Sequence, residues 1–383
     1  MLGAVKRPRR LERLPEQYFM QLLARVQDAA ARGGEPLVDL GRGNPDVPPP
    51  PHVIEALVES AREQTARVHG YAPFSGLPEL RRAIADRYAQ QYGVEVDPDH
   101  EVAVVPGTKS ALVELILCLA ERGDTVLLPD PYYPDYPSGV ALAGAELGLL
   151  PLDLERGYAP RFDLVPRERI AAVFLNYPSN PTAAAVRDGV FADAIGFARD
   201  TGAAIIHDFA YGDLVFDARK PRSFLAEPGA REVGVELFSM SKSFGMAGWR
   251  LGFVVGNAEL VARMTTLQDH VRAGIFTPVQ EAGIAALQGS QETVAERAQL
   301  YERRRDRVLT AVGELAAPCE GTFYVWIRLP DGLTPERLLE EQRLVVAPGE
   351  GFGPAGSRWA RLSLATPDEL IGLGLERLIA ALN

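Results

Sequence analysis

A lysine between two serines, followed eight residues later by an arginine, is the first set of side chains in this sequence that suggests chemistry. The lysine is Lys242, in the segment 239–250 (SMSKSFGMAGWR), and the arginine is Arg250. A primary amine condenses with an aldehyde, whereas hydroxyl and guanidinium groups bind phosphate. Together with Ser239 and Ser241, these residues suit a ligand that carries both an aldehyde and a phosphate. The alternative is an exposed polar turn, and motifs elsewhere in the sequence are needed to distinguish the two interpretations.

A second phosphate-binding turn is predicted where an apolar run meets a helix. Residues 102–105 (VAVV) resemble a strand, and Gly107, Thr108 and Lys109 follow them at the start of an apolar helical segment. The first N–H groups of a helix have no partners within the helix, so they attract anions. Thr108 acting as a simple helix cap would give the same pattern.

Aromatic and amide side chains follow the next strand-like runs. The segment 130–136 (DPYYPDY) contains Tyr132 and Tyr133, either of which can stack on a planar ring, and we favour Tyr133. The segment 176–182 (NYPSNPT) contains Asn180, whose amide can be aimed at a substituent of that ring. Taken alone, each segment is also compatible with an ordinary turn.

An acidic residue at the end of an apolar run is a sharper signal. In HDFAY, Asp208 ends such a run, and burial of a carboxylate without a partner is costly. A cationic ring nitrogen would supply the partner, and Tyr211 could reach a phenolic oxygen on the same ring. Much later, Arg361 lies in a strand-like run and could bind a carboxylate through two parallel hydrogen bonds. A helix cap for Asp208 and a surface ion pair for Arg361 are the alternatives.

These candidates follow short apolar runs that alternate with amphipathic helices. Such alternation predicts an α/β fold with a mostly parallel sheet covered by helices on both faces. Ligands of such sheets bind at the carboxyl ends of the strands, where the candidates lie. We expect strands at 102–105, 125–128, 146–151, 171–175, 203–207, 235–239 and 251–255, and helices at 14–32, 52–67, 77–92, 107–122, 186–201 and 258–272.

The pattern changes after about residue 257. A long helix at 281–315, short strands at 322–328, 344–347 and 358–364, and a last helix from 367 predict a smaller α+β domain. We therefore expect an N-terminal arm over residues 1–46 that contributes to the small domain, a large ligand-binding domain over 47–272, and a small C-terminal domain over 273–383.

Composition narrows the function. The chain has 383 residues, is 47% hydrophobic and carries a net charge of −11, which disfavours nucleic acid or an anionic membrane as the main partner. No apolar run approaches the ~18 residues of a membrane span. The two cysteines, Cys118 and Cys319, are far apart, which fits a reducing cytoplasm, and the five histidines lack metal-ligand spacing, so we expect no metal. The basic opening 6–10 lacks the apolar block of a signal peptide, and we expect a flexible arm or an oligomer contact there.

Taken together, these motifs resemble the class I/II aminotransferases of the fold type I pyridoxal-phosphate (PLP) family. The resemblance runs in the family's order from the loop at 41–46 (GRGNPD) to Arg361, and S-x-S-K followed by G-W-R-L-G is its most specific part. D-F-A-Y and N-P-T add independent support. Many members carry glycine after N-P-T, where this chain has Ala183. The resemblance implies a seven-stranded sheet in the large domain and PLP as the cofactor.

The resemblance also implies a role for each matching residue. Lys242 would form the Schiff base with PLP and would be catalytic together with Asp208, which holds the ring nitrogen protonated, and Tyr211. Tyr71 would reach the phosphate bound by a neighbouring subunit, so a homodimer is expected. The implied cofactor-binding residues are Gly107, Thr108, Lys109, Tyr133, Asn180, Asp208, Tyr211, Ser239, Ser241, Lys242, Arg250 and Tyr71; the implied substrate-binding residues are Gly43, Asn180 and Arg361.

The substrates are less sharply indicated. The motifs look most like the bacterial subgroup that contains glutamate–pyruvate (alanine) and LL-diaminopimelate aminotransferases, so we expect alanine or a similar amino acid, a 2-oxo acid and ping-pong kinetics, with glutamate as partner. Arg42, Tyr18 and Arg272 are candidates for a second carboxylate. Aspartate, aromatic or LL-diaminopimelate substrates, a carbon–sulfur lyase of the same fold, and a non-catalytic PLP-binding regulator are the alternatives.

Overall fold

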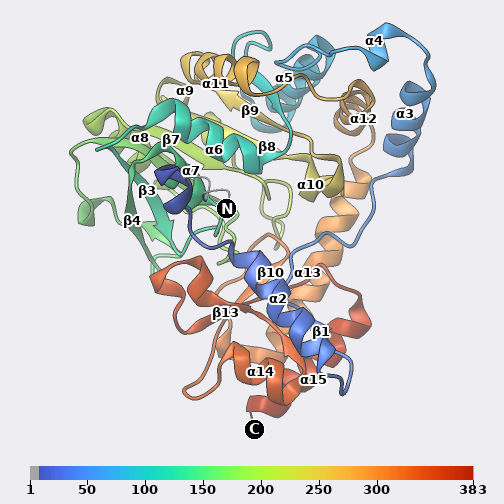
Figure 1. Ribbon diagram of the computed structural model, residues 1–383, viewed down its shortest axis with the longest axis vertical. Coiled ribbons are helices and arrows are strands. Elements are labelled where there is room, and N and C mark those ends of the chain that lie inside the picture. Colours follow the sequence, from blue (N-terminus) through green and yellow to red (C-terminus); the bar gives the residue numbers. More distant parts are fainter. Residues whose placement is uncertain (1–7, 383) are drawn as a thin grey trace, which may run out of the picture.

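The computed structural model describes residues 8–382 and is built around one large sheet (Figure 1). Strands β8, β7, β6, β3 and β4 run parallel, β9 is antiparallel to both of its neighbours, and a two-residue strand, β5, adds an antiparallel edge. The mostly parallel, seven-stranded sheet that we predicted is confirmed, with β5 as an extra edge strand. In spatial order the strands are β2 (Val102–Val105), β9 (Gly252–Gly256), β8 (Gly234–Ser239), β7 (Ala204–Asp208), β6 (Ile170–Asn176), β3 (Thr125–Asp130), β4 (Glu146–Asp153) and β5 (Ala159–Pro160).

Helices cover both faces of this sheet, so most strand residues are buried. One core contains alternate residues such as Val173 and Ile205 and packs against α5 (Pro78–Tyr92) and α8 (Val190–Thr201). Their neighbours Phe174 and Ile206 face a second core. The second core is covered by α6 (Thr108–Leu119), α7 (Tyr136–Ala143) and α11 (Ala258–Val271). This alternation follows from the two-residue period of a strand.

Strand register brings polar residues together at the carboxyl edge of the sheet. Asn176, the last residue of β6, is paired with Asp208, the last residue of β7. The adjacent strand β8 ends at Ser239 and runs directly into α10 (Met240–Ser243), which contains Lys242. Side chains separated by more than thirty residues in the sequence therefore share one edge.

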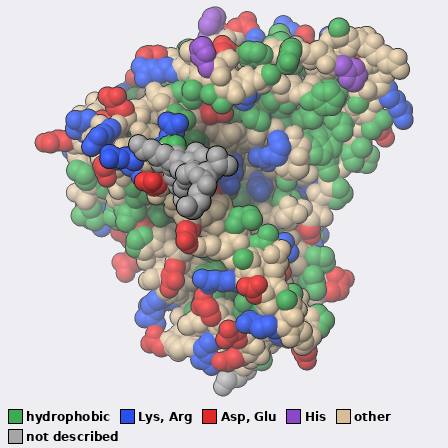
Figure 2. Space-filling view, viewed as in Figure 1, with side chains coloured by type: hydrophobic (Ala, Val, Ile, Leu, Met, Phe, Trp, Pro, Cys, Tyr) green, Lys and Arg blue, Asp and Glu red, His purple; other side chains and the backbone are tan. Residues whose placement is uncertain are grey.

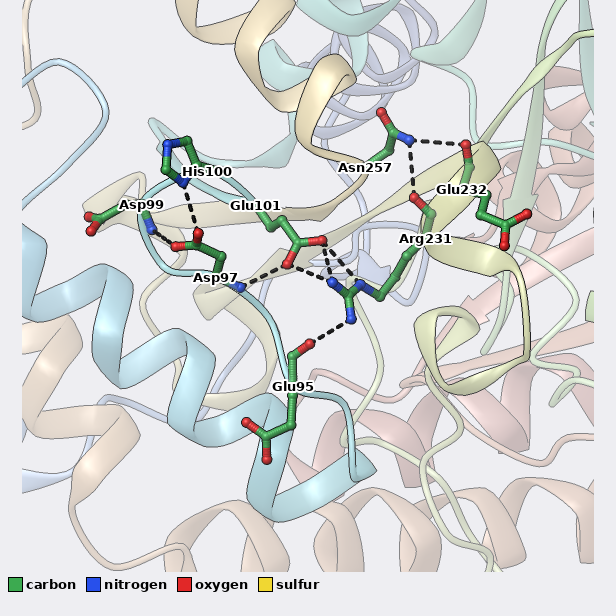
Figure 3. Close-up of polar contacts among 8 residues, drawn as sticks. All are labelled: Glu95, Asp97, Asp99, His100, Glu101, Arg231, Glu232 and Asn257. Atoms are coloured by element: carbon green, nitrogen blue, oxygen red, sulfur yellow. Dashed lines mark hydrogen bonds and ion pairs between the residues drawn. The ribbon is translucent and has the colours of Figure 1, made fainter.

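The opposite, amino end of the sheet carries a closed polar cluster (Figure 3). Arg231 lies in α9 (Ala230–Val233), just before β8, and its guanidinium donates to both carboxylate oxygens of Glu101, at 2.7 and 2.9 Å. It also donates to the carbonyl of Glu95, while Asn257, just after β9, donates to two carbonyls of α9. We call this the amino-end cluster; its residues are Glu95, Asp97, Asp99, His100, Glu101, Arg231, Glu232 and Asn257.

The C-terminal part forms a second, smaller α+β unit, as predicted. Its antiparallel sheet has the order β10 (Tyr324–Arg328), β13 (Trp359–Ser363), β12 (Ala347–Pro348). Helices α13 (Glu292–Val312), α14 (Pro335–Gln342) and α15 (Asp368–Leu382) surround it. The N-terminal segment joins this unit, because β1 (Val38–Asp39) pairs with β11 (Leu344–Val345) and α2 (Tyr18–Ala31) lies across it in blue (Figure 1).

Several predicted elements are divided in the structure. The helix predicted at 52–67 is α3 (Pro51–Arg62) followed by α4 (Ala66–His69), and the helix predicted at 281–315 is α12 (Thr277–Gln288) followed by α13. The strand predicted at 344–347 is split between β11 and β12, which belong to different sheets. Of the basic opening, residues 6 and 7 lie outside the described residues, and α1 (Arg9–Glu12) follows them.

The domain boundaries predicted at 46/47 and 272/273 stay predictions. Helix α12 begins after the second boundary, yet it packs mainly against α3 and α5. Within residues 8–382, the structure contains no helix that is both long and apolar enough to cross a membrane.

Candidate active site

A pocket of about 300 Å³ lies where the carboxyl edge of the large sheet meets the N-terminal segment and the small sheet. Figure 2 shows a hollow between the upper and lower parts of the molecule, with basic side chains inside it. The pocket is lined by Phe19, Arg42, Gly43, Asn44, Thr108, Lys109, Leu112, Tyr133, Asn176, Asn180, Asp208, Ala210, Tyr211, Lys242, Tyr324 and Arg361. Nine of the sequence-predicted site residues are among them: Gly43, Thr108, Lys109, Tyr133, Asn180, Asp208, Tyr211, Lys242 and Arg361.

Lys242 is held in the pocket by the turn between β8 and α10. The hydroxyl of Ser239 accepts a hydrogen bond from the backbone N–H of Ser241 and so caps this short helix. Burial, reinforced by the charges of Arg361 and Arg250, lowers the pKa of Lys242 to about 8, and Asp208 opposes this effect. A lysine with a lowered pKa supplies the neutral amine, which is the nucleophilic and basic form.

Asp208 presents a buried carboxylate, which is only 5% exposed. It accepts hydrogen bonds from the Tyr136 hydroxyl at 2.8 Å and from the backbone N–H of Ala210 at 3.1 Å. Burial raises the pKa of Asp208, and these hydrogen bonds oppose the rise. Among the described residues, no cationic side chain lies within ion-pair distance of this carboxylate, so the site has room for a cation from a ligand.

Asn180 connects the two sheets across the pocket. Its backbone N–H donates to the side chain of Asn176 at 2.7 Å, and Asn176 in turn donates to the carbonyl of Asp208. The side-chain oxygen of Asn180 accepts a hydrogen bond from Arg361 at 2.7 Å. The turn after β6 is thereby fixed to β7 on one side and to β13 on the other.

Arg361 is fully buried but has no carboxylate partner among residues 8–382. Besides Asn180, its guanidinium donates to the carbonyl of Gly41 at 3.1 Å and lies 3.9 Å from the ring centroid of Tyr324. Its Nε has no hydrogen-bond partner within the described part of the chain. A buried cation that is held only by neutral groups is prepared to bind an anionic ligand.

Three of the predicted phosphate residues, Gly107, Thr108 and Lys109, lie at the start of α6. Gly107 precedes the helix with a φ of +81°, and a side chain at this position would collide with the guanidinium of Arg250. Gly107, Ser239, Ser241 and Arg250 do not themselves line the pocket but flank it. Lys109 lines the pocket and is paired with Asp135 at 2.9 Å.

Tyr132 and Tyr133, the two candidates for stacking on a ring, lie in different surroundings. Tyr133 lines the pocket and makes an edge-on contact with Tyr136, whereas Tyr132 is absent from the lining and its backbone N–H donates to Phe352. Tyr211 lines the pocket, and its hydroxyl donates to that of Tyr324 at 3.1 Å. Burial raises the pKa of Tyr211 well above its ordinary value, so the phenol is protonated at neutral pH.

Other sequence candidates lie elsewhere. Tyr71 is 92% exposed and does not line this pocket. Tyr18 donates to the carbonyl of Pro348, and Arg272 lies 3.8 Å from Glu114. Neither residue lines the pocket. Of the three candidates for a second carboxylate, only Arg42 lines the pocket.

Sequence reasoning missed six residues that line the pocket, Phe19, Asn44, Leu112, Asn176, Ala210 and Tyr324, and also Tyr136, which contacts Asp208. Phe19 and Tyr324 belong to distant elements, α2 and β10, and read as ordinary core positions in the sequence. Asn176 and Tyr136 lie within the quoted motifs, and the position of Asn176 directly after an apolar run was the same signal that found Asp208.

Ala183 occupies the position where many members of the resembled family carry glycine. It adopts a left-handed φ of +59° although it is not glycine, and it is fully buried. The backbone N–H of Ala183 donates to the carbonyl of Ser179, and the backbone N–H of Asn180 donates to the side-chain oxygen of Asn176. The substitution leaves the amide of Asn180 in the pocket.

A comparison with protein families settles the kind of protein. Residues 35–378 match the family model described as aminotransferase class I and II. The chain belongs to the class I and II aminotransferases. It is therefore a PLP-dependent transaminase of fold type I, which moves an amino group between an amino acid and a 2-oxo acid.

Named relatives agree with this assignment. The L-glutamine--4-(methylsulfanyl)-2-oxobutanoate aminotransferase of Bacillus subtilis (strain 168) is 41% identical over 94% of this chain and 92% of its own length. The glutamate-pyruvate aminotransferase AlaC of Escherichia coli (strain K12) is 39% identical over 93% of this chain and 89% of its own. A substrate-bound BacF structure from Bacillus subtilis superposes with a TM-score of 0.93 at 38% identity, covering 98% of both chains.

The chemistry of the pocket fits PLP. Asp208 is a buried carboxylate that a ring cation would match, and the start of α6, with Gly107 beside Arg250, fits a phosphate. Lys242 supplies the amine, and Tyr133 offers an aromatic face. Among the described residues, no group of three or more His, Cys, Asp or Glu side chains could hold a metal ion.

Proposed function

We propose that this aminotransferase transfers the amino group of alanine or a similar small amino acid, with glutamate and 2-oxoglutarate as the second pair, by a ping-pong sequence. One observation carries the proposal: the amine of Lys242 and the carboxylate-free guanidinium of Arg361 face the same 300 Å³ pocket. One group suits proton transfer at the α-carbon, and the other suits the α-carboxylate beside it.

The proposed roles follow from the contacts. When bound, PLP supplies an aldehyde that exchanges amines and a cationic ring that accepts the electrons released when the α-proton leaves. Asp208 would neutralise the ring cation, and Tyr136 would hold that carboxylate in place. The free amine of Lys242 would take the proton from the α-carbon and return it to the cofactor side.

The remaining residues would orient the two ligands. Tyr211 and Asn180 would contact the phenolic oxygen of PLP, and Tyr133 would stack on its ring. The phosphate would be bound by Gly107, Thr108, Lys109, Ser239, Ser241 and Arg250. Gly43 would lie over the substrate; a side chain there would collide with the hydroxyl of Tyr324, so only glycine leaves this wall of the pocket intact.

Arg42 supports glutamate as the second substrate. It lines the pocket, and Asp39 holds its Nε at 2.6 Å, which fixes the guanidinium at the pocket wall. We propose that it binds the distal carboxylate of glutamate. In Arg42→Gln the KM for glutamate should rise roughly tenfold, as expected for a partly exposed charge pair, while the KM for alanine stays unchanged. Equal changes for both substrates would contradict this role.

A half-reaction screen tests the substrate directly. Each amino acid is added to the PLP form of the purified protein, and loss of the visible absorbance band of bound PLP is followed. Alanine and glutamate should bleach the band fastest. Glutamine as the best donor would favour the activity named for the Bacillus subtilis relative.

Lys242→Ala is the matching control for this screen. It should lose the visible band and at least about 10⁴-fold in activity, because both the covalent attachment and the proton transfer depend on this amine. A wild-type protein that never takes up PLP, or a fully active Lys242→Ala variant, would remove the basis of the proposal.

We also propose a homodimer with shared sites. Helices α3, α4 and α12 pack together, and they and the adjoining loops leave an exposed apolar surface at Ile54, Val58, Tyr71, Phe74 and Phe276. Hydrophobic area is visible over this part of the molecule at the upper right (Figure 2). Such surfaces on monomers mark interaction sites, and a second copy that receives Tyr71 at its phosphate would cover this one.

Subunit mixing tests the shared site. Tyr71→Phe and Lys242→Ala homodimers should each be impaired, and a mixture should regain activity, because one site in each mixed dimer has both intact residues. A mixture of wild-type and Lys242→Ala subunits controls for exchange. No regained activity under conditions of proven exchange would place Tyr71 outside the partner's site.

We further propose a cytoplasmic location, since both cysteines are free thiols.

A further inference from the structure

Directly behind the pocket, the other face of the large sheet carries a buried polar network. His207 on β7 and Glu236 on β8 are register partners, and both side chains are fully buried. The Nδ1 of His207 lies 2.7 Å from Oε2 of Glu236. His207 immediately precedes Asp208, and strand alternation places the two side chains on opposite faces of the sheet.

The carboxylate of Glu236 is surrounded by donors. Tyr88 and Ser223 donate their hydroxyls to Oε1 at 2.7 and 2.8 Å, and the backbone N–H of Phe224 donates to Oε2 at 2.7 Å. His207 completes the set. An ionised carboxylate offers about four lone-pair sites, which Tyr88, Ser223, Phe224 and a His207 protonated at Nδ1 would fill.

The second ring nitrogen of His207 faces another acceptor. Nε2 lies 3.1 Å from the carbonyl oxygen of Tyr177, which can only accept a hydrogen bond. A hydrogen bond to this carbonyl requires a proton on Nε2, and a hydrogen bond to an ionised Glu236 requires a proton on Nδ1. With both protons present the pair would be an imidazolium next to a carboxylate, and the complete set of hydrogen bonds would offset the cost of burying both charges.

From this network we propose that His207 is a positioning residue, which as an imidazolium ties the ends of three strands together behind the pocket. Tyr177 is the first residue after β6, His207 lies in β7, and Glu236 lies in β8. The connection thus fixes, relative to one another, the strand ends that carry Asn180, Asp208 and Lys242. This inference rests on the proposed roles of those three residues, not on the identity of the substrate.

The charge on His207 also acts through the sheet. It lies behind Asp208 and, together with the hydrogen bonds to that carboxylate, works against the rise in the pKa of Asp208 that burial causes. The other titratable groups near Glu236 come from α5: Tyr88, and beyond it Tyr92 and Arg87, which is paired with Asp213 at 2.5 Å. His207 is the cation that contacts Glu236 directly.

The protonation state can be measured without any activity. In protein labelled with ¹⁵N-histidine and free of PLP, both ring nitrogens of His207 should carry hydrogens at neutral pH, and the signals are assigned by their loss in His207→Gln. Four other histidines in the chain serve as internal comparisons. A ring nitrogen of His207 without hydrogen would overturn the proposal and leave the function of Lys242 untouched.

The positioning role predicts a kinetic effect. In Glu236→Gln, kcat per PLP-loaded subunit should fall roughly 10- to 100-fold, the scale expected when reacting groups are displaced by a fraction of an ångström, while KM changes less. Glu101→Gln in the amino-end cluster is the matched control, because it weakens the other end of the same sheet. If Glu236→Gln keeps the wild-type kcat at equal loading, or if the control loses as much, the role is purely structural and the proposal fails.

Discussion

The two ends of the large sheet each contain an arginine, and the two arginines differ in burial and in ion pairing. At the amino end, Arg231 is bound to both oxygens of Glu101 although 44% of its side chain is exposed. At the carboxyl end, Arg361 is fully buried, and within residues 8–382 it is held only by neutral groups: an amide oxygen, a carbonyl and three aromatic rings. An unpaired charge is more costly when it is buried. Stability alone would therefore favour a carboxylate partner for the buried Arg361 over one for the partly exposed Arg231, which is the opposite of the observed pairing.

This difference identifies the pocket as the place where a ligand can supply the missing ion-pair partners. The amino-end cluster pairs Arg231 with Glu101. Among the described residues, by contrast, the pocket contains a cation without a carboxylate partner, Arg361, and a carboxylate without a cationic partner, Asp208. An amino acid bearing a carboxylate and a cofactor bearing a cationic ring match both. Incomplete pairing in a buried place is thus a better guide to function here than the number of ion pairs.

Among the changes that test this comparison of the two sheet ends, removal of the unpaired arginine should have the largest effect. Arg361→Ala should lower kcat/KM by roughly 10²- to 10³-fold, mostly through KM, because a buried charge-assisted pair with the substrate is worth about 3–4 kcal/mol. Arg361→Lys should recover part of the loss, since it restores the charge but not the two parallel bonds. PLP affinity, measured by titration of the apoprotein, should change much less; an equal loss in PLP affinity would contradict the assigned role.

A pH titration sharpens the comparison at Lys242. In the PLP-free protein, the rate at which this amine captures an added aldehyde should rise with pH and level off above about 8, the value to which burial and the nearby arginines lower the pKa. Arg361→Ala should move the midpoint upward by removing one repulsive charge. Capture can be followed by reduction and peptide mass spectrometry, and a rate that is flat around pH 8 would rule out the lowered pKa.

The same shift has a consequence for stability. Because the pKa of Lys242 is lower in the folded protein than its ordinary 10.5, the unfolded chain binds more protons between about 8 and 10.5. The contribution of this lysine to the free energy of unfolding therefore becomes more favourable as pH rises through that window. Lys242→Met should remove this part of the pH dependence.

The smallest effect is expected at the amino end. Arg231→Met should lower the free energy of unfolding by about 1–2 kcal/mol, because Glu101, only 8% exposed, loses its partner. Activity per loaded subunit should stay within about twofold of wild type. Chemical denaturation and steady-state kinetics measure the two quantities, and a large loss of activity would show that the two ends are not independent.

Local sequence patterns were sufficient for the elements that are buried on both faces. The run at 102–105 coincides with β2, and polar residues that follow or end three of the apolar runs line the pocket, namely Thr108, Asn180 and Asp208. The helix α7 was missed because Pro137, Gly139 and Gly144 make its sequence look like a turn. The three residues 289–291 that separate α12 from α13 contain a single glycine, which was too weak a signal against a long helical pattern.

Tertiary packing accounts for the site contacts that local sequence patterns could not predict. Tyr324 faces Gly43 and Arg361 only because β10 pairs with β13 and the N-terminal segment closes over both. Likewise, His207 was dismissed as a metal ligand from its spacing, and only the register of β7 with β8 reveals its partner, Glu236. Contacts across a fold have no fixed spacing in the sequence, so no periodicity could have found them.

The bond from Arg361 to the carbonyl of Gly41 has a consequence for how this enzyme is made. A ribosome releases the chain from its N-terminus, so Gly41 and every residue proposed to touch PLP emerge well before Arg361 does. A growing chain therefore contains all of its own proposed PLP-binding residues before Arg361, which is proposed to bind the substrate carboxylate, has been synthesised. Newly synthesised molecules gain the ability to turn over substrate only when β13 has left the ribosome and closed against the segment made at the very beginning.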